Sequence, residues 1–129
     1  MAKSLHPYVF HSSFGLNSAV TSEFLDEQGY FDNPEQLRQC FKTILATGNI
    51  QQVTLHGGPF KPLVRLISAA SRSITQLHLV RMQLMDDDIP FICHCQNVTD
   101  LNIGANNITD NGVRLLCDSL TKFVKFCSY

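Results

Sequence analysis

The stretch that decides the fold is Val98–Leu120, VTDLNIGANNITDNGVRLLCDSL. Its first part has apolar residues at the close spacing of a short strand, and its last part has them three and four positions apart, as in a helix. Asn106 and an Asp-Asn-Gly turn that ends at Gly112 lie between the two parts. The apolar positions are Val98, Leu101, Ile103 and Ile108, then Val113, Leu116 and Leu120. The stretch therefore predicts a strand, a turn and a helix in succession.

The apolar pattern of this stretch recurs upstream at a constant interval. Composition alone gives an apolar match at any one position with a probability of about 0.4–0.5. Four columns over three repeats are all apolar, which is hard to attribute to chance. The columns are Ile50, Ile74 and Val98; Val53, Leu77 and Leu101; Leu55, Leu79 and Ile103; and Phe60, Leu84 and Ile108. We infer three structural repeats that stack in register.

The repeat resembles a leucine-rich repeat of the ribonuclease-inhibitor type, whose pattern is LxxLxLxxNxIxDxG followed by a helix. The third repeat matches best, whereas Gly58 and Met82 replace the asparagine in the first two and Asp88 replaces the turn glycine in the second. The resemblance covers Ile50 to about Phe126. It implies an α/β fold: a short right-handed solenoid with a parallel sheet on its concave face and helices on its convex face.

The flanking segments complete the expected domain organisation. Residues 1–33 are rich in aromatic residues without a sustained period, so we expect an irregular N-terminal segment that caps the open end of the core. Residues 34–129 form the expected solenoid. Its parts are a leading helix at 34–47, repeats at about 50–73, 74–97 and 98–122, and the start of a further strand at 123–129. Because a finished solenoid ends with a polar cap, this ending suggests a truncated form of a longer protein.

Charge and cysteine content restrict the partners and the compartment. A net charge of −1, with no clustered Lys or Arg, provides no field for nucleic acid or a membrane surface. The first residues lack the apolar run of roughly 7–15 residues of a secretory signal. Five irregularly spaced cysteines favour free thiols in a reducing compartment. We expect a cytoplasmic protein, with the nucleus as the alternative, and not a secreted one.

The candidate binding site follows from the alternation of side chains along a strand. If the apolar columns face the core, the intervening residues line the concave surface in rows across neighbouring strands. These rows are Gln52, Gln76 and Asp100; Thr54, His78 and Asn102; and His56, Val80 and Gly104. Parallel strands lie about 4.8 Å apart, so these side chains can form one polar, nearly neutral patch.

Motifs for catalysis and cofactor binding are absent from the sequence. It has no nucleophile elbow, phosphate-binding loop, dinucleotide fingerprint or HExxH motif, so we expect neither an enzyme nor a cofactor. The Cys93-His94-Cys95 segment would point its thiols about 200° apart on a helix, which favours packing over metal binding. Cys117 occupies the position of Cys93 in the next repeat and is expected to pack in the same way. The acidic run Asp86–Asp88 is typical of a helix start.

Members of the family that this sequence resembles bind other proteins through the concave face and its rims. The resemblance therefore implies an intracellular protein-interaction module that acts as an adaptor or scaffold. One alternative is the substrate-recognition subunit of a ubiquitin ligase, and another is a metal-dependent hydrolase that uses His56 and His78. A third is a truncated isoform with little binding of its own. The sequence specifies neither the partner nor the oligomeric state.

Overall fold

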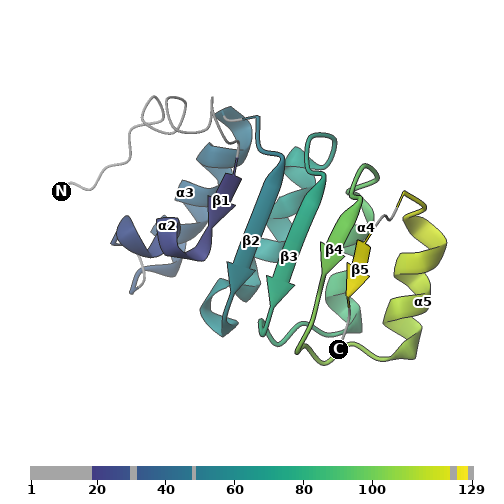
Figure 1. Ribbon diagram of the computed structural model, residues 1–129. Coiled ribbons are helices and arrows are strands. Elements are labelled where there is room, and N and C mark those ends of the chain that lie inside the picture. Colours follow the sequence, from purple (N-terminus) through teal and green to yellow (C-terminus); the bar gives the residue numbers. More distant parts are fainter. Residues whose placement is uncertain (1–18, 30–31, 48, 123–124, 128–129) are drawn as a thin grey trace.

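A computed structural model describes residues 19–29, 32–47, 49–122 and 125–127. Five strands form a single sheet, and they lie in it in the order in which they occur along the chain (Figure 1). Every neighbouring pair is parallel, so each strand is joined to the next by a crossover connection. The elements are β1 (Ala19–Thr21), α2 (Ser22–Glu27), α3 (Pro34–Thr47), β2 (Gln52–His56), η1 (Gly58–Ala70), β3 (Gln76–Val80), η2 (Asp86–Asp88), α4 (Ile89–Cys93), β4 (Asp100–Asn102), α5 (Asp110–Ser119) and β5 (Lys125–Cys127).

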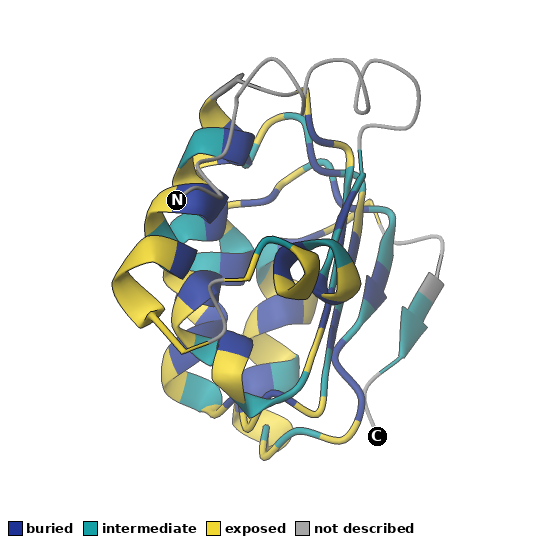
Figure 2. Cartoon of the chain, turned by 90° about the vertical axis from the view of Figure 1, so that its left-hand side faces the viewer, coloured by how far each residue is buried: buried dark blue, intermediate teal, exposed yellow. Residues whose placement is uncertain are grey.

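The helices gather on one side of the sheet, as the edge-on view in Figure 2 shows. The expectation of an α/β fold with a parallel sheet is therefore confirmed. The hydrophobic core lies between the two layers, where the apolar sides of α3, η1, α4 and α5 meet the inward side of the strands. In the part of the chain that the structure describes, no helix is long and apolar enough to cross a membrane.

The strand register reproduces the interval between the repeats of the sequence. Val53 pairs with Leu77, and Leu77 pairs with Leu101. Burial confirms that the apolar columns point into the core: every member is buried except Ile108, which is partly buried and packs against the core. The interval therefore corresponds to one strand and its crossover, because a residue and its counterpart in the next repeat lie side by side.

The backbone repeats at the same interval in the turn after each of these strands. Gly57, Arg81 and Ala105 all have positive φ angles, of 111°, 55° and 58°. Each turn is joined to the next by a hydrogen bond of the same kind, since the Gly57 N–H donates to the Val80 carbonyl and the Arg81 N–H to the Gly104 carbonyl. A left-handed residue is uncommon outside glycine. A positive φ thus recurs at the repeat interval, although Gly57, with a ψ of 149°, lies outside the left-handed helical region.

The Asn106 side chain forms hydrogen bonds with the loops of both the second and the third repeat. Its side-chain oxygen accepts the N–H groups of Met82 and Leu84, at 2.9 and 3.1 Å. Its side-chain nitrogen donates to the carbonyls of Leu79 and Ile103, at 2.7 and 2.8 Å. One amide thus satisfies backbone groups that the turn leaves without partners in the sheet.

The N-terminal part departs from the expected irregular cap over residues 19–27. Ala19–Thr21 forms β1, which extends the sheet by pairing with β2, and Ser22–Glu27 forms helix α2. Thr21 caps this helix by accepting the Phe24 N–H at 3.1 Å. A strand this short shows no period in the sequence, which is why it was not predicted. The rest of the expected cap at 1–18, and residues 30–31, lie outside the described residues.

The remaining elements fall within the expected ranges, with one difference in helix type. Helix α3 occupies Pro34–Thr47, the range expected for the leading helix, and β5 lies within the expected strand at 123–129, of which 123–124 and 128–129 lie outside the described residues. The crossover between β2 and β3 is a 3-10 helix, η1, which contains Pro62. Proline lacks the N–H that an α-helix needs, so it suits the early part of a crossover and disfavours regular α-helical bonding there.

Candidate functional site

The candidate site is the side of the sheet that faces away from the helices (Figure 2). Along β2, Val53 and Leu55 are buried, while Gln52 and Thr54 are half-buried and His56 is exposed. Along β3, Leu77 and Leu79 are buried and the intervening residues are not. This alternation follows from the period of two in a strand, which places polar side chains on the side opposite the core.

The register brings most of the predicted surface residues together in lateral rows. Gln52 pairs with Gln76 and Gln76 with Asp100, and Thr54 pairs with His78 and His78 with Asn102. His56 pairs with Val80 at the carboxyl ends of β2 and β3. We call the solvent-facing residues of these rows the open face; they are Gln52, Thr54, His56, Gln76, His78, Val80, Asp100 and Asn102.

Gly104 is the one predicted residue that does not lie on the open face. It is buried and comes after the end of β4 at Asn102. Its N–H donates to the side chain of Asn102 at 2.9 Å, and its carbonyl accepts the Arg81 N–H at 3.2 Å. Both of its backbone groups are thus used to close the turn after the strand. The alternation of faces ends with the strand, which is why the prediction does not extend to this position.

A side-chain contact between two strands of the open face was not predicted from the sequence. The Nε2 atom of His78 lies 3.3 Å from Oδ1 of Asp100, on the adjacent strand. The two side chains are 28% and 24% exposed, so both remain accessible from solvent. His78 and Asp100 stand in neighbouring rows, and this diagonal contact depends on how the imidazole is turned, which residue spacing does not specify.

The two histidines do not form the centre of a metal site. The His56 N–H donates to the Ser22 hydroxyl at 2.7 Å, which ties β2 to the start of α2, while the His56 side chain is exposed. His78 has Asp100 as its partner instead. Among the residues that the structure describes, no group of three or more His, Cys, Asp or Glu side chains could hold a metal ion.

The cysteines are all free thiols, and they differ in their surroundings. Cys40 and Cys95 are buried, and burial raises the pKa of each thiol to about 12, because the thiolate is poorly solvated there. Cys93 is partly buried and packs against the core, as expected. Cys117, expected to pack in the same way, is exposed on α5. The repeat interval carries burial over from Ile92 to Leu116 but not from Cys93 to Cys117.

The open face therefore offers hydrogen-bonding groups of uncharged amides, a hydroxyl and two imidazoles, with a single carboxylate. Such a set can form hydrogen bonds with another molecule. No family model matches the chain, and no match is found among the curated proteins or the solved structures.

Proposed function

We propose that this protein is a leucine-rich-repeat module that binds a partner protein through the open face and acts as an adaptor or scaffold. The observation that carries the proposal is the parallel sheet with its described helices on one side only. Parallel sheets are almost always covered on both sides. A sheet side that carries polar, partly exposed residues instead is suited to be covered by another molecule.

Three features favour the leucine-rich-repeat assignment and its right-handed solenoid. Strands follow one another in chain order, with the apolar columns of successive repeats in register. The turns after β2, β3 and β4 each have a residue with a positive φ angle at the repeat interval. Asn106 bonds to the backbone of the preceding repeat, as the asparagine of such a repeat would. Right-handed crossovers are the rule for parallel strands, which agrees with this assignment.

The chemistry of the open face favours a protein over other partners. Gln52, Gln76 and Asn102 can each donate and accept hydrogen bonds, which fits the mixture of groups on a protein surface. The face has no clustered cations of the kind that nucleic-acid phosphates require. Free thiols favour a reducing compartment, so we propose that binding takes place in the cytoplasm.

The experiment compares the partners recovered by the full chain with those recovered by surface variants. Thr54→Lys and Gln76→Lys are the test variants, since neither side chain makes a hydrogen bond among the contacts described for this face. Asn102 is less suitable because its side chain also holds the Gly104 N–H. Partners are identified by affinity purification and mass spectrometry. We expect each test variant to lose the specific partner, because an unpaired ammonium group would be buried in the interface.

Matched controls carry the same substitution on the helical side. Ala46→Lys, Ser68→Lys and Cys117→Lys place a lysine at exposed positions of α3, η1 and α5. They should recover the partner as the unmodified chain does. Loss of the partner with the control variants, and its retention with Thr54→Lys and Gln76→Lys, would contradict binding through the open face.

A further inference from the structure

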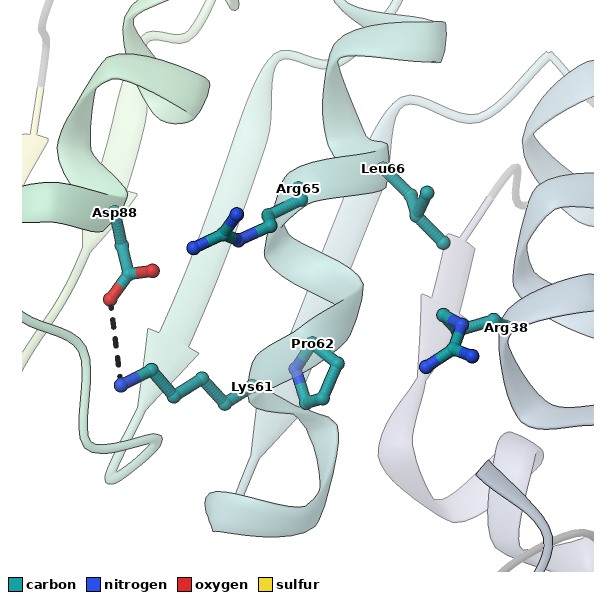
Figure 3. A pocket seen from close by; sticks show the side chains of 6 residues that line it. All are labelled: Arg38, Lys61, Pro62, Arg65, Leu66 and Asp88. Atoms are coloured by element: carbon teal, nitrogen blue, oxygen red, sulfur yellow. Dashed lines mark ion pairs between the residues drawn. The ribbon is translucent and has the colours of Figure 1, made fainter. Parts of the chain in front are cut away.

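A pocket of about 400 Å³ lies on the helical side of the molecule, away from the open face (Figure 3). Three elements line it: α3 contributes Arg38, η2 contributes Asp88, and η1 between them contributes the rest. The lining residues are Arg38, Lys61, Pro62, Arg65, Leu66 and Asp88. The pocket therefore spans successive repeats and exists only when their helices pack together.

The charge of the lining favours an anionic ligand. Arg38, Lys61 and Arg65 are positive and Asp88 is negative, which leaves two net positive charges around the pocket. Asp88 is 4% exposed and accepts the Met85 N–H at 2.9 Å, so its carboxylate is already engaged by the protein. The Lys61 ammonium lies 3.8 Å from the Asp88 carboxylate and donates to a backbone carbonyl. With Lys61 close to Asp88, the remaining positive charge of the lining comes from the guanidinium groups of Arg38 and Arg65.

Arg65 is the cation of the pocket lining for which the described residues supply no acidic partner. Its guanidinium lies 5.2 Å from the centre of the Phe91 ring, a cation–π contact that helps to hold the group in place. Among the residues that the structure describes, no carboxylate lies within ion-pair distance of Arg65. The donors at the edges of a guanidinium form a planar fork that matches phosphate and carboxylate oxygens. Arg65 is thus available to an anion that the described part of the chain does not supply.

Arg38 lines the pocket from the opposite side, on α3, whereas the Lys61 and Arg65 side chains extend toward Asp88 (Figure 3). Figure 3 shows Arg38 reaching in from α3, with Pro62 and Leu66 between it and the Lys61 and Arg65 side chains. Its present partner is Glu35 on the same helix, and both side chains are largely exposed. An exposed pair of this kind is weak and can be exchanged for a ligand.

We propose that this pocket binds a small organic phosphate monoester. A phosphate carries a charge of about −1.5 to −2 at neutral pH, which matches the net charge of the lining better than a single carboxylate does. Pro62 and Leu66 offer an apolar surface for the organic part. The pocket volume lies within the range of about 300–1,000 Å³ that is typical of small-molecule sites. This site is separate from the open face and goes beyond the proposed partner binding.

The test is calorimetric titration of the full chain with phenyl phosphate, inorganic phosphate and benzoate at low ionic strength. We expect phenyl phosphate to bind about tenfold more tightly than either of the others, since only it combines a dianion with an apolar body. Arg65→Gln should weaken the binding of phenyl phosphate about tenfold, the effect of losing one charge-assisted pair of hydrogen bonds.

Arg114→Gln is the matched control, because Arg114 is exposed on α5 outside the pocket and the substitution removes the same charge. It should bind phenyl phosphate as the unmodified chain does, and circular dichroism should show that both variants remain folded. Equal affinities for phenyl phosphate and inorganic phosphate would overturn the proposal. Equal losses in Arg65→Gln and Arg114→Gln would do so too, since they would indicate a general effect of charge.

Discussion

The side-chain oxygen of Asn106 accepts the backbone N–H of Met82 at 2.9 Å and so joins equivalent positions of two successive repeats. The first two repeats have no asparagine at these positions, which hold Gly58 and Met82. This one side chain therefore serves the junction between the second and third repeats, where it bonds to both loops. Stability at that junction should depend on it more than on any neighbouring polar residue.

Replacement of Asn106 by Ala should lower the free energy of unfolding by about 3 kcal/mol, because it leaves several backbone groups without their partner. Equilibrium unfolding in urea measures the loss. Asn107→Ala is the control, since the Asn107 side chain is exposed and only its backbone N–H bonds to Leu84. That variant should change stability by no more than about 0.5 kcal/mol. Equal effects of the two substitutions would contradict the role given to the Asn106 amide.

Replacement of Leu101 by Ala should lower the free energy of unfolding by about 2–5 kcal/mol. The substitution removes a fully buried side chain from the column of Val53, Leu77 and Leu101 and leaves a cavity. Leu115→Ala makes the same chemical change at a position on α5 that is 40% exposed. The change in the denaturation midpoint, at an unchanged slope, reports the difference between the two variants. A Leu101→Ala protein as stable as Leu115→Ala would contradict the inward placement of this column.

The contribution of Asp86 to stability should depend on pH. Hydrogen bonds from the Thr109 hydroxyl and N–H, at 2.5 and 2.9 Å, hold the pKa of the Asp86 carboxyl below its usual value. Because the pKa is lower in the folded state, this contribution is fully present above the unfolded pKa of about 3.9 and is lost as the pH falls through the folded pKa. Asp86→Asn should therefore be less stable than the unmodified protein at pH 7, with a smaller difference at pH 3.

Thermal unfolding of both proteins at the two pH values provides this comparison. Asp87→Asn is the control, because Asp87 is the exposed neighbour in η2 and makes no hydrogen bond through its side chain among the described contacts. A difference for Asp86→Asn that stays constant from pH 7 to pH 3 would contradict the role of the ionised carboxylate.

The cysteines should react with alkylating reagents at clearly separate rates. Cys117 is exposed and should be modified first in the native protein. Cys40 and Cys95 should react only after unfolding, because they are buried and the pKa of each is raised to about 12, which leaves little thiolate. Brief treatment with N-ethylmaleimide followed by peptide mass spectrometry measures the order. Modification of Cys95 as fast as that of Cys117 would place Cys95 on the surface.

The parallel sheet and its register were predictable because burial of one side of a strand imposes an apolar residue at every second position. Val53 and Leu55 show this alternation in β2. Val53, Leu77 and Leu101 lie on successive strands and pair as their spacing indicates. Strand β1 lies outside the pattern because it is short and because the separation between Ala19 and its partner Gln52 is longer than the repeat. Neither its length nor its spacing follows that of β2 and β3.

The residues of the open face were predictable once the register was known. Side chains alternate along a strand, so the buried apolar residues also identify the outward-facing ones. The contact between His78 and Asp100 was not, because it depends on side-chain rotamers across two strands. The pocket beside Arg65 was missed for a related reason. Its lining comes from three elements at separate points of the chain, and their distance in space is set by the packing of whole helices.

The order of the strands also affects how the chain folds. Each strand pairs with the next one along the chain, and the separation between paired residues is nearly the same from β2 to β5 and somewhat longer from β1 to β2. The entropy lost on closing a loop grows only slowly with its length, so these closures differ by about 0.3 kcal/mol at most. Each strand added to the sheet therefore requires one more loop closure with nearly the same loss of entropy. The folding rate should consequently vary little with the number of strands.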